Sequence, residues 1–265
     1  MAEPDRKRLR ETFTEAAELY DRARPGYPPK MFDDLDDLAG VGPACRVLEL
    51  GCGTGQATVP LAERGCRIVA VDLGADMARV ARRNLARFPQ VEVVTSAFED
   101  WPLPEDPFDA VVSATAFGWI DPAVRVTKAA DALRPGGVLA TVATRHVAGG
   151  SDAFFAEVQK CYEQFDPSTP PGLQLPSAAD VPSDSEELDR SGRFGPAIFR
   201  RYERELTYST VAYLDLLSTY SGHRALTPTA REGLLKCIGI LIDRRHGGRV
   251  TKRYLTELRI ARRIR

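Results

Sequence analysis

The 265-residue chain lacks the cysteine pattern of a disulfide framework or of a zinc site. It has five cysteines, an odd number, and none of them forms a C-x-x-C pair. This usage predicts reduced thiols in the core of a cytoplasmic protein. The chain also lacks an apolar run of the ~20 residues that a membrane span requires. Its charged first residues lead into no signal-peptide core, so we expect neither a membrane segment nor a secreted protein.

The chain has little net charge, −1 at pH 7, which gives no overall argument for a nucleic-acid partner. Basic residues are nevertheless concentrated in residues 241–265, which contain nine Arg or Lys and two acidic residues. We interpret this run as a solvated strand and terminus rather than as a nucleic-acid site. Hydrophobic residues make up 43% of the chain, enough for a sizeable core in one large domain or one domain with an insert.

A glycine-rich turn in residues 47–55, Val-Leu-Glu-Leu-Gly-Cys-Gly-Thr-Gly, organises the chain. Its apolar half predicts a short buried strand, and its three alternate glycines allow positive φ and the close approach of a ligand. A helix is expected next, followed by a second strand that ends at Asp72. A strand that enters a helix through a glycine turn is typical of nucleotide sites. An acidic residue about 20 positions later is where a ribose hydroxyl binds.

The spacing of the glycines separates two kinds of nucleotide site. Dinucleotide sites require G-x-G-x-x-G, whereas this chain has G-x-G-x-G with Gln56 at the place of the third glycine. Together with Glu49, the run resembles motif I of the class I S-adenosylmethionine (SAM)-dependent methyltransferases. The order L-R-P-G-G-x-L at residues 133–139 is also similar to a loop of those enzymes.

A second resemblance lies at residues 20–28, which read Y-x-x-x-R-P-x-Y-P. This pattern is similar to a segment before motif I in one subgroup of small-molecule methyltransferases. The resemblance implies an N-terminal helical lid in residues 1–40, whose Tyr20 and Arg24 close over the methionine end of SAM. An amphipathic helix is expected over residues 6–19, ended by the prolines that follow. A plain surface connector is the alternative.

Strands and helices alternate five times up to strand five, which predicts an α/β fold with a doubly wound, mostly parallel sheet. The resemblance implies seven strands in a Rossmann-like sheet whose last strand is antiparallel. We expect a SAM-binding core over residues 41–144 and a mainly helical, substrate-side insert over residues 145–195. The C-terminal part of the core sheet, with helices, would occupy residues 196–265. Residues 166–192 are acidic and rich in proline, and fit either a disordered loop or a substrate lid.

The resemblance also implies which residues bind SAM. Backbone groups of the glycine turn would approach the methionine tail and the ribose, and Asp72 would accept hydrogen bonds from the ribose hydroxyls. Relatives often read the adenine edge with an Asp where this chain has Ser96, so we expect backbone groups of the next two residues to do so. The expected cofactor contacts are Tyr20, Arg24, Glu49, Gly51, Gly53, Asp72, Leu73, Met77, Ala97, Phe98 and Ser113.

The residues for catalysis are less clear from the sequence. Many relatives carry a His directly before the residue equivalent to Trp119, but this chain has Gly118 there. His146 and His223 are therefore the candidate general bases, although each histidine taken alone is more often structural than catalytic. Methyl transfer needs no strong base where the enzyme mainly aligns the reactants. The sequence contains neither a metal-ligand cluster nor a phosphate loop with its lysine.

We therefore expect a SAM-dependent methyltransferase (EC 2.1.1) that acts on an O, N or C atom of a small-molecule acceptor. A nucleic-acid or protein methyltransferase and a non-catalytic SAM-binding protein are the alternatives. An NAD-dependent oxidoreductase is disfavoured by the absence of G-x-G-x-x-G. A base-methylating enzyme is disfavoured because the loop after strand four lacks N/D-P-P-Y/F. The acceptor and the oligomeric state stay open.

Overall fold

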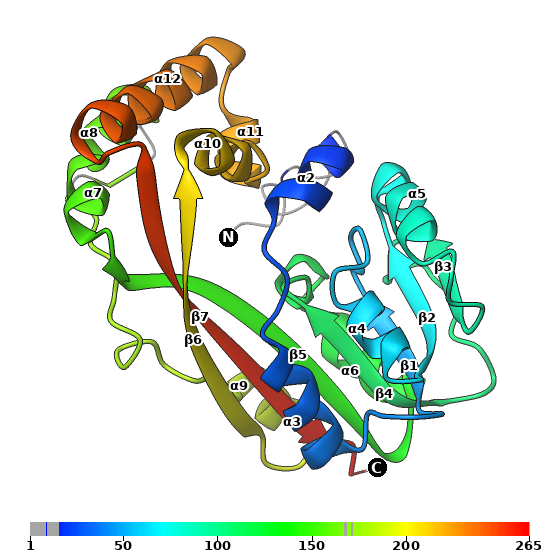
Figure 1. Ribbon diagram of the computed structural model, residues 1–265. Helices are drawn as coiled ribbons and strands as arrows, with labels where there is room; N and C mark the ends of the chain where they lie inside the picture. Colours follow the sequence, from blue (N-terminus) through cyan, green and yellow to red (C-terminus); the bar gives the residue numbers. More distant parts are fainter. Residues whose placement is uncertain (1–8, 10–15, 167–168, 171, 265) are drawn as a thin grey trace. The chain divides into compact units, whose positions relative to one another are not determined.

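The computed structural model describes residue 9 and residues 16–166, 169–170 and 172–264. Its strands form one seven-stranded sheet in the order β3-β2-β1-β4-β5-β7-β6 (Figure 1). The strands are β1 (Arg46–Leu50), β2 (Arg67–Asp72), β3 (Val91–Thr95), β4 (Phe108–Ala114), β5 (Leu133–Gly150), β6 (Ile198–Ser209) and β7 (Arg249–Arg262).

Helices connect most of these strands. They are α2 (Ala17–Ala23), α3 (Pro29–Ala39), α4 (Thr58–Glu63), α5 (Ala75–Asn84), the 3-10 helix η2 (Phe117–Trp119), α6 (Arg125–Ala132), α7 (Asp152–Glu157), α8 (Gln159–Phe165), α9 (Glu186–Ser191), α10 (Thr210–Ser218), α11 (Ser221–Ala225) and α12 (Pro228–Arg245). Most of the helix expected over residues 6–19 lies outside the described residues. The short helix α9 falls in the acidic stretch for which the sequence predicted no element.

The sheet is parallel on one side and antiparallel on the other. Strand β1 pairs in parallel with β2 and β4, and β4 pairs in parallel with β5. Strand β7 runs against β5, because Arg263 N donates to Gly137 O (2.8 Å) and Ser151 N donates to Thr251 O (2.9 Å). The expected α/β, doubly wound sheet with an antiparallel end is therefore confirmed.

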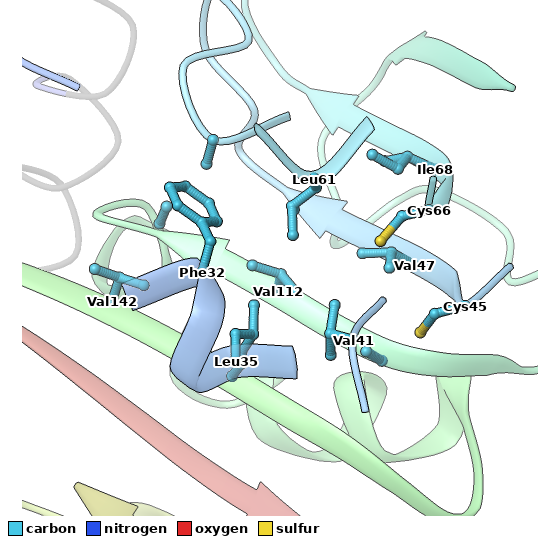
Figure 2. Close-up of a cluster of buried hydrophobic side chains, with 14 of the residues drawn as sticks. Phe32, Leu35, Val41, Cys45, Val47, Leu61, Cys66, Ile68, Val112 and Val142 are labelled. Carbon is cyan, nitrogen blue, oxygen red and sulfur yellow. The ribbon is translucent and has the colours of Figure 1, made fainter. Parts of the chain in front are cut away.

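Successive residues of the central strands face opposite sides of the sheet, and both sides are buried. Val47 of β1 and Val112 of β4 pack on one side with Phe32 and Leu35 of α3 (Figure 2). Leu48, the next residue of β1, belongs to the hydrophobic cluster on the other side. Burial on both sides explains why these parallel strands read as continuous apolar runs.

The chain forms two compact units, each assembled from three separate stretches. Unit 1 contains the residues up to Arg24 together with residues 145–182 and 203–255. Unit 2 contains residues 25–144, 183–202 and 256–265. The segments expected from the sequence follow chain order, so they group the residues differently; their boundaries stay predictions.

Two interpretations of composition need correction. Cys161 of α8 and Cys237 of α12 form a disulfide in unit 1, so the expectation that every cysteine is reduced is wrong. The sequence did not indicate this pair, because its two cysteines lie 76 positions apart and the other three cysteines, which are buried free thiols, make the total odd. In the basic run, Lys252 is buried rather than solvated. None of the helices in the described part of the chain has the length and apolar character for crossing a membrane.

Candidate cofactor site

The glycine turn, residues 51–55, leaves the end of β1 in a conformation that requires glycine. Gly51 has φ +70°, and its N–H donates to Val71 O of the neighbouring strand at 2.8 Å. A Cβ atom on Gly51 would lie 2.3 Å from the Cβ of Ala116, far inside van der Waals contact. The left-handed backbone and the close approach of Ala116 both exclude a side chain at this position.

Asp72, at the end of β2, joins the glycine turn to the start of α5. Its Oδ2 accepts a hydrogen bond from Gly53 N at 2.7 Å, and its Oδ1 accepts one from Gly74 N at 2.8 Å. Burial raises the pKa of Asp72 to about 6, although the two backbone N–H groups oppose that shift. A carboxylate offers about four lone-pair directions, so it can accept further donors beside these two.

Glu49 of β1 is a buried carboxyl group with an unused acceptor. The residue is only 1% exposed, and its Oε2 has no hydrogen-bond partner among the described residues. Burial raises the pKa of Glu49 to about 7; the Thr58 hydroxyl opposes this shift and the charge of Asp72 adds to it. A buried polar atom without a partner is costly, so a ligand that donates to Glu49 would gain binding energy here.

The adenine-side candidates lie at the ends of β2 and β3. Leu73 is 41% exposed, whereas the side chains of Met77 and Phe98 are buried in the core. The backbone N–H groups of Ala97 and Phe98 have no hydrogen-bond partner within the part of the chain that the structure describes. This corner therefore offers an exposed apolar side chain beside two unused donors.

The end of β4 contains Ser113, one of the expected cofactor contacts, and is supported by Tyr27, which was not among them. Ser113 is fully buried, and its hydroxyl donates to Leu50 O at 2.9 Å, which ties β4 to β1. Two residues later, Thr115 takes φ +57°, which is uncommon for a residue other than glycine. Tyr27 supports this turn, because its hydroxyl donates to Ala114 O (3.2 Å) and lies 2.9 Å from Thr115 Oγ1. Tyr27 is the second tyrosine of the pattern at residues 20–28, which is the signal that pointed to it.

Tyr20 and Arg24 belong to unit 1. The helical spacing holds: Arg24 N donates to Tyr20 O at 3.0 Å, and the guanidinium carbon of Arg24 lies 5.0 Å from the centre of the Tyr20 ring. Arg24 Nε also donates to Thr219 Oγ1 at 2.7 Å. The contact of these two residues with the methionine end of SAM stays a prediction.

The two candidate bases also belong to unit 1. His146 lies inside β5, which continues to Gly150, and burial lowers the pKa of His146 to about 3. Burial likewise lowers the pKa of His223 to about 4, and its Nε2 lies 3.1 Å from the Tyr162 hydroxyl. Both side chains are thus neutral at pH 7 and weaker bases than an ordinary histidine. A catalytic role for either of them stays a prediction.

Comparison with known proteins places a methyltransferase pattern on unit 2. Residues 47–137 match the family described as a methyltransferase domain. An uncharacterized methyltransferase of Mycobacterium tuberculosis is 43% identical over 131 residues, which cover 49% of this chain and 51% of the relative. The malonyl-[acyl-carrier protein] O-methyltransferase of Geobacter sulfurreducens is 37% identical over 121 residues, 44% of this chain and 45% of that enzyme. The chain thus spans about half the length of the curated relatives it matches.

A solved structure extends the similarity to most of the fold. A protein named as a type II methyltransferase, from Anaeromyxobacter dehalogenans, superposes with a TM-score of 0.59 at 27% identity. The match covers 90% of this chain and 97% of that one. Residues 47–137 are therefore similar in sequence to methyltransferase domains, and the seven-stranded sheet has the Rossmann-like fold of a methyltransferase.

Proposed function

We propose that the protein binds SAM and transfers its methyl group to an O, N or C atom of a small-molecule acceptor. One observation carries the proposal. The Asp72 carboxylate bridges Gly53 N and Gly74 N, and the buried Glu49 stands beside them with an unused acceptor. This arrangement offers negative charge and open backbone to a ligand that combines a ribose with a cationic group.

The groups of unit 2 match the parts of SAM one by one. Asp72 retains lone pairs for the ribose hydroxyls, and Glu49 Oε2 offers an acceptor to the methionine ammonium. Leu73 offers an exposed apolar surface to a face of adenine. The unused N–H groups of Ala97 and Phe98 are donors for acceptor nitrogens of the adenine ring. These residues therefore fit the cofactor that the similarity suggests.

When bound, SAM supplies an electrophilic methyl group on its sulfonium. The part of the protein is then to hold both substrates and exclude water, which by itself lowers the barrier of a two-substrate reaction. His146 and His223 have pKa values of about 3 and about 4, well below the value near 7 that suits a general base. Alignment of the acceptor is thus favoured over strong base catalysis.

Two further roles belong to this proposal. Tyr20 and Arg24 would close over the methionine end of SAM, as the pattern at residues 20–28 implies. The insert over residues 145–195 would select the acceptor, because it interrupts the alternation of strands and helices that builds the SAM site. Neither role is needed for the cofactor contacts that unit 2 provides.

Calorimetry with SAM and with S-adenosylhomocysteine tests the proposal. We expect both to bind in the presence of a chelator, and NAD not to bind. Asp72→Ala should weaken binding by about 2 kcal/mol, roughly 30-fold, because the ribose loses charge-assisted acceptors. Asp76→Ala is the matched control, since Asp76 is an exposed carboxylate at the start of α5 whose nearest charged partner is Arg79. Binding of NAD in place of SAM, or equal affinities for a folded Asp72→Ala protein and the wild type, would refute the proposal.

A further inference from the structure

Unit 1 contains a buried lysine in an unusual environment. Lys252 and Tyr254 are alternate residues of β7 and so share one side of the strand. Lys252 is only 3% exposed, and its Nζ donates to the Tyr220 hydroxyl at 3.0 Å. The same Nζ lies 6.0, 5.3 and 5.1 Å from the ring centres of Tyr213, Tyr220 and Tyr254. We call Lys252 and these three tyrosines the tyrosine cage.

The tyrosine cage contains a positive charge without a negative one. No carboxylate of the described residues lies within ion-pair distance of Lys252 Nζ, and its one hydrogen-bond partner among them is the Tyr220 hydroxyl. An ammonium has three N–H donors, so two remain. Contacts with aromatic faces stabilise an ammonium only in part, by less than the cost of removing it unpaired from water. An anion bound at Nζ would supply the missing charge.

Neutral hydrogen-bonding groups surround the same region. The hydroxyls of Tyr208 and Tyr254 lie 3.0 Å apart. The His146 ring lies 6.4 Å from the Tyr254 ring, and its buried Nε2 has no partner among the described residues. The ring of His223 lies 5.6 Å from that of Tyr220, and its buried Nδ1 is equally unused among those residues. Hydroxyl and imidazole donors are suited to the oxygens of a carboxylate.

The electrostatics of Tyr220 agree with a positive region. Burial alone would raise its pKa, but the charges of Lys252 and Arg24 and the hydrogen bond from Lys252 bring the pKa of Tyr220 below its ordinary value. Arg24 contributes because its guanidinium carbon lies 4.4 Å from the centre of the Tyr220 ring. The region therefore favours a negative ligand over a neutral one.

We propose that the tyrosine cage is an anion-binding site that holds the carboxylate of a small organic acid, with Lys252 as its central charge. The aromatic rings of Tyr213, Tyr220 and Tyr254 would contact the carbon skeleton of that acid. This proposal rests on the proposed function only where it identifies the acid as the methyl acceptor. Binding of a carboxylate to unit 1 does not depend on it.

A panel of matched ligands tests the inference on the wild-type protein. Benzoate, hexanoate and succinate serve as probes, with benzamide and hexanamide as uncharged counterparts of similar shape. We expect saturable calorimetric binding of at least one carboxylate and none of its amide. Equal behaviour of acids and amides, or no saturable binding by any of the acids, would overturn the inference.

Variants locate the site. Lys252→Met should weaken binding of the carboxylate by about tenfold or more, the loss of one charged hydrogen bond. Lys236→Met, at an exposed lysine of α12, should leave it unchanged. Tyr220→Phe removes only a hydroxyl and provides a second variant if Lys252→Met does not fold. Carboxylate binding that survives both folded variants would place the anion elsewhere and refute the inference.

Two controls separate the possible failures. S-adenosylhomocysteine should bind the Lys252→Met protein as it binds the wild type. Loss of binding of both S-adenosylhomocysteine and the carboxylate would indicate a damaged fold, and the comparison of acids with amides on the wild-type protein would then decide whether the site binds an anion. Carboxylate binding without S-adenosylhomocysteine binding would sink the proposed function and leave the anion site intact. Ultraviolet absorbance of tyrosinate at neutral pH, present in the wild type and absent in Tyr220→Phe, would show an internal anion and overturn the inference.

Discussion

Replacement of Gly51 by alanine tests whether the glycine turn is built on two separate constraints. At φ +70° an alanine occupies a left-handed conformation, which costs about 1–2 kcal/mol. Its Cβ would also lie 2.3 Å from the Cβ of Ala116, and relief of such an overlap costs about 1–3 kcal/mol. We expect Gly51→Ala to lower the free energy of unfolding by about 2–5 kcal/mol.

Two matched variants separate these costs. Gly40 has φ +69°, but a Cβ there would have no atom within 4 Å, so Gly40→Ala carries the backbone cost alone. The double variant Gly51→Ala with Ala116→Gly removes the overlapping methyl group. The nearest remaining atom is the Ala116 Cα at 3.8 Å, an ordinary contact. The double variant should therefore recover about 1–3 kcal/mol relative to Gly51→Ala, after subtraction of the effect of Ala116→Gly alone.

Urea unfolding of the four variants and the wild type gives the coupling energy between positions 51 and 116. Calorimetry with S-adenosylhomocysteine on the same proteins shows whether the backbone of the turn binds the ligand. The reasoning fails if Gly51→Ala costs no more than Gly40→Ala, or if Ala116→Gly restores nothing. Either result would mean that the turn or Ala116 shifts enough to accommodate a side chain at position 51.

Three further predictions concern Glu49, Arg24 and the disulfide. Burial raises the pKa of Glu49 from 4.5 to about 7, so the folded protein holds a proton that the unfolded chain releases. Glu49 should then contribute a fall of about 3 kcal/mol in the free energy of unfolding as the pH rises from about 4.5 to 7. In urea titrations at several pH values the fall should be smaller by that amount in Glu49→Gln, which keeps the contribution of Asp72, whose pKa burial also raises. Arg24→Ala should weaken the binding of S-adenosylhomocysteine by roughly 1.5–3 kcal/mol and the binding of methylthioadenosine much less, since methylthioadenosine lacks the carboxylate. Equal losses for the two ligands would argue against the lid. Reduction of the Cys161–Cys237 disulfide, whose cysteines are 76 residues apart, should lower the free energy of unfolding by about 2–4 kcal/mol. Thiol titration that finds five free cysteines without reductant would contradict the disulfide.

The sequence was most informative where structure depends on near neighbours. The glycine turn and Asp72 were predicted because a tight turn at the end of one strand and a carboxylate at the end of the next require particular residue types at fixed spacings in the sequence. The start of helix α12 has local signals of the same kind: Thr227 caps it through a hydrogen bond from Ala230 N at 3.3 Å, and Pro228 occupies its first position.

The features that the sequence did not indicate depend on distant partners. The helix α9 is held by an ion pair from Glu187 to Arg125, 62 positions away, and by the burial of Leu188. Lys252 was interpreted as solvated because a basic run on a strand normally faces water. Two of the tyrosines around it, Tyr213 and Tyr220, lie more than 30 positions earlier in the chain. Tyr27 was quoted as part of a pattern but not chosen, because its partner Ala114 lies 87 positions along the chain.

The position of β7 in the sheet has a consequence for synthesis on the ribosome. Strand β7 lies between β5 and β6, although both of them precede it in the chain (Figure 1). Residues 210–248 separate β6 from β7, so at about 5–20 residues per second the nascent chain contains β6 for several seconds before β7, its neighbour in the sheet, is synthesised. Over that interval β5 and β6 present unpaired backbone edges of the kind that recruit other strands. Release of nascent chains stalled before residue 249 should therefore yield aggregating species, whereas chains stalled well beyond residue 262 should yield a protected sheet.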